Sequence, residues 1–179
     1  MRAVQKTMSV FLGHLRTEVR SASWFAALGE PLTDGDRAEA KIYAGTDEVE
    51  LVTSWPDAER FLKSPATLDW WEREETLRKE LLARAEARHP ERAFWTSLTE
   101  LTTETGDLVH GKAATAAARM TGAAPASIHV AAGAASQAVY QLAVARMAGE
   151  TASLFESKFR LFAAGRWPLG VAGSRLVLF

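Results

Sequence analysis

The sequence has 179 residues, the length of a single ordinary domain. A chain of this size buries roughly 70% of the surface that its unfolded form exposes, so it needs no disulfide or metal to stabilise a core. Its 21 basic and 22 acidic residues leave a net charge of −1, which argues against binding to nucleic acid or to an anionic membrane. Because cysteine is absent, disulfides, thiolate metal sites and a cysteine nucleophile are excluded. Alanine is unusually frequent, and it is concentrated in the last third of the chain.

The N-terminal segment is predicted to be a helix rather than a targeting signal. It contains no continuous apolar run ahead of a small-residue cleavage site, which a secretory signal requires. Met8, Leu12, Leu15 and Val19 recur at helical spacing, so we predict a helix over 3–20 that packs on a core. We therefore expect a cytoplasmic protein.

Eight further helices are predicted from periodicity and from residues that favour helix ends. Glycine adopts the left-handed conformation that ends many helices, and Ser, Thr or Asp side chains cap their first turns. By these signals Gly106 ends one helix and Asp107 caps the next. The predicted helices cover residues 22–28, 34–44, 54–62, 69–88, 90–106, 108–121, 126–148 and 152–164.

The C-terminal segment 166–179 changes from helical to strand periodicity. Segments 167–171 and 174–179 flank Ala172-Gly173, which predicts a β-hairpin over 166–179. A lone hairpin is marginally stable in water, so it must pack on helices or pair with a possible strand at 48–53. The fold class is therefore mainly α. We expect a single helical domain, 1–179, of eight or nine helices around a central alanine-rich helix, with a small C-terminal β-hairpin.

The alanine-rich segment 126–148 is long enough to cross a bilayer and contains one formal charge, Arg146. Alanine is only weakly apolar, however, and His129, Ser136 and Gln137 lower the apolar content further. We interpret the segment as a helix buried among other helices, and we predict no membrane span.

Two charged residues fall on faces that are otherwise apolar. Glu74 lies four residues after Trp70 on the apolar face of helix 69–88, with Arg78 on the same side, and Lys158 lies near the middle of the last apolar helix face. Burying an unpaired charge costs several kcal/mol, so we predict a partly buried ion pair of Glu74 with Lys158 or with Arg78. The pair is either structural or part of a ligand-binding site, since perturbed charges concentrate at functional sites.

A second polar group follows one side of the alanine-rich helix. His129, Ser136 and Tyr140 share this side with Gly133, which leaves space beside them. The three side chains either line a small-molecule pocket or are satisfied polar groups within a helical core. They do not indicate a catalytic triad, because no acid is placed to orient the imidazole.

Four acids form a pattern with a known counterpart. Glu72-x-x-Glu75 is followed later in the chain by Glu104-x-x-Asp107, and this pattern resembles the motif of the all-α nucleoside triphosphate pyrophosphatases of the MazG and dimeric dUTPase type. In that family four acids on two neighbouring helices hold Mg²⁺ for the attack of water on a nucleotide. The resemblance implies that these four residues bind Mg²⁺. The alternative interpretation is a solvated acidic face followed by an N-cap.

Other catalytic patterns are missing from the sequence. There is no glycine-rich phosphate loop, no His-Glu-x-x-His and no Gly-x-Ser-x-Gly. The pairs Glu86/His89 and Asp107/His110 match only part of a di-metal pattern. Because large aromatic residues are abundant on the amphipathic helices, we expect a non-enzymatic module that binds a protein partner or a second copy of itself and needs no cofactor. A pyrophosphatase or another small-molecule enzyme is the alternative.

Overall fold

The computed structural model describes the backbone of residues 2–89 and 91–179 and the side chains of residues 12–89 and 92–179. Its elements, in chain order, are α1 (Arg2–Ser21), α2 (Asp34–Ala44), β1 (Val49–Leu51), α3 (Trp55–Leu62), the 3₁₀ turn η1 (Pro65–Thr67), α4 (Leu68–Arg88), α5 (Glu91–Arg119), α6 (Pro125–Met147), α7 (Leu154–Ala163), β2 (Pro168–Ala172) and β3 (Arg175–Leu178). The mainly α class is confirmed, although the described residues form seven α-helices rather than eight or nine.

Two local predictions from the sequence are wrong, and together they explain why fewer helices are present than predicted. Segment 22–28 forms successive turns rather than a helix, because Phe25 has a left-handed φ of 59° that is incompatible with a helix. Gly106 does not end a helix: α5 continues through it, and Asp107 is therefore not an N-cap. A glycine inside a helix costs about 1 kcal/mol relative to alanine, and the packing of α5 along α6 outweighs this cost.

A continuous buried stripe on α5 explains why the helix stays intact. The stripe repeats every three or four residues on both sides of Gly106. Its members are Phe94, Leu98, Leu101, Thr105, Val109, Ala113 and Ala116.

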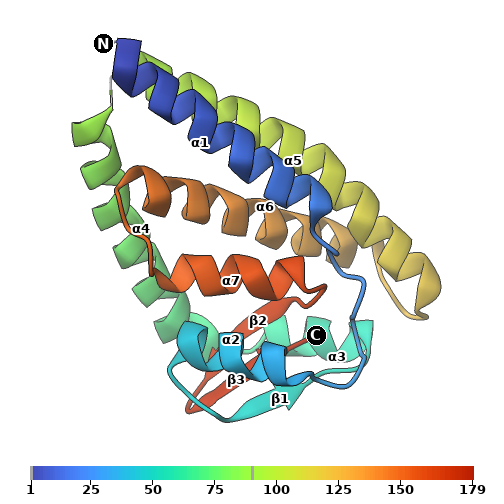
Figure 1. The fold of residues 1–179 in the computed structure, drawn as a ribbon. Coiled ribbons are helices and arrows are strands. Elements are labelled where there is room, and N and C mark those ends of the chain that lie inside the picture. The colour runs from blue at the N-terminus through green and yellow to red at the C-terminus, as the bar shows by residue number, and fades with distance from the viewer. Residues whose placement is uncertain (1, 90) are drawn as a thin grey trace.

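Helix α6 lies at the centre of the fold, as the alanine content predicts. It contacts α1, α4, α5 and α7, and Figure 1 shows it crossing beneath α1 and α5 with α7 on its other side. Small buried side chains such as Ala131, Ala135 and Ala138 let the neighbouring backbones approach closely. Its one charge, Arg146, forms ion pairs with Glu18 of α1 and Glu156 of α7. Among the described helices, none is both long enough and apolar enough to span a bilayer.

The C-terminal hairpin pairs with the short early strand. In the order β1-β3-β2, β3 is antiparallel to β2 and parallel to β1, with Val49 opposite Leu176. Buried aromatic rings fix this sheet to the helices: Trp55 of α3 lies edge-on to Phe179 with ring centres 5.3 Å apart. Of the two alternatives that the sequence leaves open, both occur: the hairpin pairs with a strand in segment 48–53 and also packs on helices.

Gly106→Ala is expected to raise the free energy of unfolding by about 0.5–1 kcal/mol, because alanine loses less backbone entropy than glycine on entering a helix. A Cβ added at Gly106 would lie 3.9 Å from Ser136 Oγ, an ordinary contact. Gly165→Ala is the matched control, since Gly165 has a φ of +94° and an added Cβ would lie 2.7 Å from the Ala27 nitrogen. Urea unfolding followed by circular dichroism measures both, and a destabilised Gly106→Ala variant would contradict the continuous helix.

Candidate functional site

A buried ion pair joins α4 to α7. Lys158 Nζ lies 2.8 Å from Glu74 Oε2 and 3.0 Å from Glu74 Oε1, and both side chains are almost fully buried, with exposed fractions of 2% and 3%. This is one of the two pairings that the sequence predicts. The other pairing, between Glu74 and Arg78, is wrong, because Arg78 binds its neighbour Glu75 instead.

Tyr43 of α2 and two tryptophans of α4 surround this pair. The Tyr43 hydroxyl donates to Glu74 Oε1 over 2.9 Å and accepts from Trp70 Nε1 over 3.0 Å. Lys158 Nζ also lies 5.1 Å from the centre of the Trp71 ring, within cation–π range. The cluster of Tyr43, Trp70, Glu74 and Lys158 thus ties three helices together with its polar groups directed at one another.

Burial controls the protonation of this cluster. Burial lowers the pKa of Lys158, and the nearby Glu74 carboxylate opposes that shift. Burial also raises the pKa of Tyr43 well above 10, so its hydroxyl stays protonated and donates to Glu74 at neutral pH. No member of the cluster lines either of the two pockets that are described below. The geometry therefore supports a structural role for Glu74 and Lys158.

The polar side of α6 is divided between two neighbouring helices, α4 and α5. Tyr140 accepts a hydrogen bond of 3.2 Å from Arg78 of α4. Ser136 is half-buried beside Gly106 of α5, and His129 is exposed. None of these three side chains lines either of the two pockets described below.

Glu75 is expected to contribute to stability at neutral pH and to lose that contribution in acid. Hydrogen bonds from Arg78 Nε and Nη2, both 2.7 Å, lower the pKa of Glu75 to about 2 from an ordinary value of 4.5. A carboxyl with a depressed folded-state pKa stabilises the fold above its unfolded-state value and loses this effect as the pH falls through its folded-state value. The gap in stability between the wild type and Glu75→Gln should therefore narrow between pH 4.5 and pH 2. Urea unfolding at several pH values measures the gap, and a gap that is constant over this range would contradict the pairing.

The four acids of the pyrophosphatase-like pattern do not converge. Glu104 binds Arg16 and Arg20 of α1 at 3.2 and 3.6 Å, and Glu75 binds Arg78. Glu72 and Asp107 are exposed. In the described part of the chain, no group of three or more His, Asp or Glu side chains is placed to hold a metal ion. The geometry that the Mg²⁺ mechanism needs is therefore not formed by these residues.

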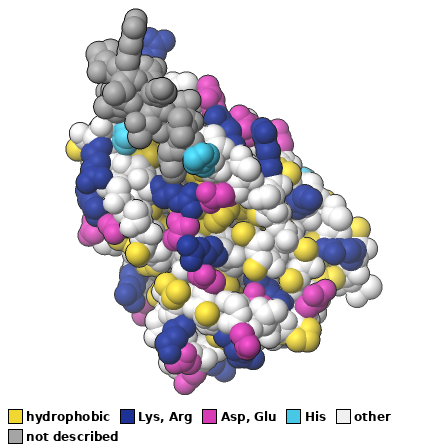
Figure 2. Space-filling model, in the orientation of Figure 1, with side chains coloured by type: hydrophobic (Ala, Val, Ile, Leu, Met, Phe, Trp, Pro, Cys, Tyr) yellow, Lys and Arg dark blue, Asp and Glu magenta, His cyan; other side chains and the backbone are white. Residues whose placement is uncertain are grey.

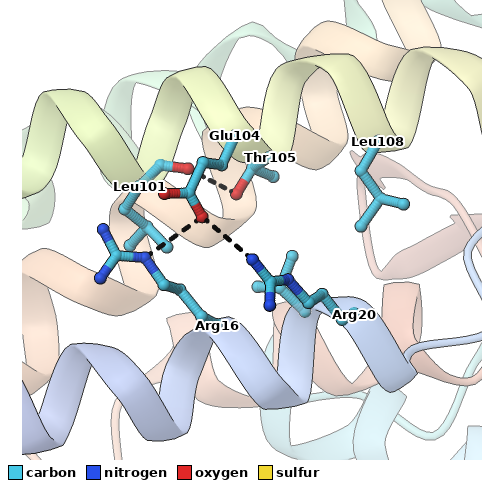
Figure 3. Close-up of a pocket in the computed structure, with 7 residues that line it drawn as sticks. Arg16, Arg20, Leu101, Glu104, Thr105 and Leu108 are labelled. Carbon is cyan, nitrogen blue, oxygen red and sulfur yellow. Dashed lines mark hydrogen bonds and ion pairs between the residues drawn. The ribbon is translucent and has the colours of Figure 1, made fainter.

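A pocket of about 240 Å³ lies between α1 and α5, lined by Arg16, Val19, Arg20, Leu101, Glu104, Thr105 and Leu108. Figure 3 shows Glu104 between the two arginines, with its carboxylate in contact with both, and shows Leu101 and Leu108 to either side. We call this pocket the α1–α5 groove. The sequence does not predict this groove, because α1 and α5 are far apart in the sequence and only the fold brings them together.

A smaller pocket of about 190 Å³ lies where the turn after α1 meets the end of α5. It is lined by Phe25, Ala26, Leu28, Glu30, Arg119 and Met120. The Phe25 ring is fully buried against Phe162 and Trp167, and this packing holds its unusual backbone conformation.

Arg166 is a second buried charge that sequence reasoning does not pair. Its guanidinium lies 2.9 Å from Asp36 Oδ2 and donates to the carbonyl oxygens of Ala27, Glu30 and Pro31 over 2.5, 2.7 and 2.6 Å. Arg166 therefore fastens the loop before α2 to the end of α7. A capping box of Thr33 and Asp36 at the start of α2 holds the carboxylate in place.

Comparisons of the chain with known protein families, with curated proteins and with solved structures found no significant match. The functional interpretation of this fold therefore rests on its own geometry.

Proposed function

We propose that this protein is a non-enzymatic binding module whose α1–α5 groove receives a segment of a partner protein that carries an acidic side chain beside aliphatic ones. The single observation that carries the proposal is the lining of the groove: an apolar floor between two arginines whose counter-ion is an exposed carboxylate.

The size of the groove favours side chains of a protein over a metabolite. Its volume of about 240 Å³ is below the range of about 300–1,000 Å³ that is typical of small-molecule pockets. Val19 and Leu101, which are almost fully buried, and the half-buried Leu108 form the apolar part of the lining, so Leu108 is the main apolar contact for an aliphatic side chain of the partner. A partner segment that places such side chains in the groove gains the burial of their apolar area.

The charges of the groove favour an acidic partner. Glu104 is 47% exposed and Arg20 is 72% exposed, and ion pairs between exposed groups contribute only about 0–1 kcal/mol. A carboxylate from a partner therefore replaces Glu104 at little cost. Arginine suits this exchange because its planar guanidinium binds carboxylates in a bidentate manner.

The groove lacks an arrangement for chemistry among its described residues. The Thr105 hydroxyl donates to the Leu101 carbonyl over 2.8 Å, so it is not held as a nucleophile. The Glu104 carboxylate contacts Arg16 and Arg20 instead of that hydroxyl, as Figure 3 shows. This arrangement supports binding rather than catalysis.

The rest of the surface favours a different protein as partner over a second copy. The large hydrophobic side chains that are exposed within the described residues, Ile42, Leu68, Trp95 and Val130, lie on four different helices. Figure 2 shows charged side chains of both signs interspersed over one face, with hydrophobic side chains in small groups. Permanent homodimers bury interfaces that are larger and more apolar than this groove. A small groove of this kind is therefore more typical of a reversible complex with another protein.

Fluorescence anisotropy with two labelled peptides tests the proposal. One peptide contains alternating pairs of Glu and Leu, and the other carries Lys in place of every Glu. We expect saturable binding of the acidic peptide and at least about tenfold weaker binding of the basic one, since each tenfold step corresponds to about 1.4 kcal/mol of charge-assisted contact.

Matched variants locate the binding. Arg16→Ala/Arg20→Ala removes both arginines of the groove and should weaken the acidic peptide about tenfold or more. Arg60→Ala/Arg175→Ala removes two exposed arginines, one on α3 and one on β3, and should leave affinity unchanged. Equal binding of the two peptides, or equal affinity of the two double variants, would contradict the proposal.

A further inference from the structure

Two histidines face each other across the α5–α6 interface. The ring centres of His110 on α5 and His129 on α6 are 4.9 Å apart, and the ring planes are inclined by 33°. Both side chains are exposed, so their rings are free to turn. The sequence indicates His129 as a candidate ligand-binding residue and His110 as part of a partial metal pattern, but only the fold brings the two together.

The spacing of the rings matches that of two imidazoles on one metal ion. With Zn–N bonds of about 2.0–2.1 Å and tetrahedral geometry, two ligating rings place their centres about 5 Å apart. The observed separation is 4.9 Å. Rotation about the side-chain bonds is then enough to direct one nitrogen of each ring at a common point.

The packing of α5 against α6 fixes the backbone positions of the two histidines, while their exposed rings can turn. Val109 and Ala113 on α5 and Ala131 on α6 are fully buried next to the histidines. Binding groups carried on packed helices are positioned more accurately than groups on loops.

The helix surface beside the two histidines is open. Gly111 follows His110, and Gly133 lies one turn after His129 on the same face of α6. A Cβ added at either glycine meets no atom of the described residues within 4 Å. Asp107, exposed and three residues before His110, adds a negative charge on the same side of α5.

We propose that His110 and His129 form a site for a divalent transition-metal ion of the Zn²⁺, Ni²⁺ or Cu²⁺ class, which bridges α5 and α6. Neutral imidazole is a preferred ligand of these ions, whereas Mg²⁺ and Ca²⁺ prefer oxygen ligands. Two histidines supply two coordination positions, and water completes the shell. The site is separate from the α1–α5 groove and does not depend on the function proposed for it.

Calorimetric titration with ZnCl₂ and NiCl₂, with MgCl₂ as a control, tests the site in the full chain. We expect one Zn²⁺ or Ni²⁺ ion per chain and no binding of Mg²⁺. Because the ion binds only the folded arrangement of the two helices, a concentration of one hundred times Kd should raise the melting temperature by roughly 5–10 °C.

Single histidine variants separate this site from other histidines. His110→Ala and His129→Ala should each abolish the rise in melting temperature, since one imidazole cannot chelate an ion. His14→Ala removes an exposed histidine of α1 and should leave the rise intact. Paramagnetic Ni²⁺ should broaden the imidazole NMR signals of His110 and His129 before those of His14. Titrations that show no binding, or a melting shift that persists in His129→Ala, would overturn the proposal.

Discussion

Lys158→Met should lower the free energy of unfolding by about 3–5 kcal/mol, the cost typical of breaking a buried ion pair by removing one partner. The substitution leaves the Glu74 carboxylate buried, with the Tyr43 hydroxyl as its remaining donor within the cluster. Methionine has nearly the length of lysine, so little packing is lost. Urea unfolding followed by tryptophan fluorescence measures the change.

A double variant distinguishes an uncompensated charge from lost packing. Glu74→Met/Lys158→Met replaces both charges with apolar side chains and should be more stable than Lys158→Met alone. It should not reach the stability of the wild type, because the buried Tyr43 hydroxyl loses its acceptor, at a cost of about 1–3 kcal/mol. A double variant as unstable as the single one would show that packing dominates the effect.

Arg166→Met should also lower the free energy of unfolding by about 3–5 kcal/mol. The variant leaves Asp36 buried without its counter-ion and removes the guanidinium donor from the carbonyls of Glu30 and Pro31 and from that of Ala27, which keeps the Glu30 N–H as a donor. Arg166→Lys should recover little of this loss, because a single ammonium group cannot replace the planar fork of the guanidinium.

Arg160→Met is the matched control for this prediction. Arg160 lies on α7, six residues before Arg166. Its side chain is 54% exposed and pairs with the partly buried carboxylates of Glu39 and Glu156, so its loss should cost only about 1 kcal/mol. Thermal and urea unfolding of the three variants provide the comparison. Similar losses for Arg166→Met and Arg160→Met would show that the buried contacts of Arg166 contribute little.

The charges inside the fold could be predicted in part from the sequence. Glu74 and Lys158 each interrupt an apolar helix face, and helical periodicity alone identifies both. Tyr43 carries no comparable signal, because its contact with Glu74 depends on how α2 is placed against α4 and α7. Arg166 lies outside any helix, between Gly165 and Trp167, so no periodic pattern predicts its pairing with Asp36.

Sequence signals for the ends of helices give wrong predictions where tertiary packing opposes them. Gly106 and the threonines around it favour a helix end, yet the stripe that α5 buries continues past the glycine. The opposite case is segment 22–28, where a short helix is predicted and burial of the Phe25 ring imposes turns. Predicting the α1–α5 groove or the His110–His129 pair requires the relative positions of two helices. The periodicity within one segment does not provide that information.

Methyl NMR of the full chain during titration with the acidic peptide tests the assignment of the α1–α5 groove most directly. The methyl groups of Val19, Leu101 and Leu108 line the groove and report on its occupation. We expect their signals to shift with one common Kd in the wild type, and with a Kd at least about tenfold larger in Arg16→Ala/Arg20→Ala. Saturable peptide binding that leaves these three residues unshifted, and moves methyl signals elsewhere, would contradict the assignment.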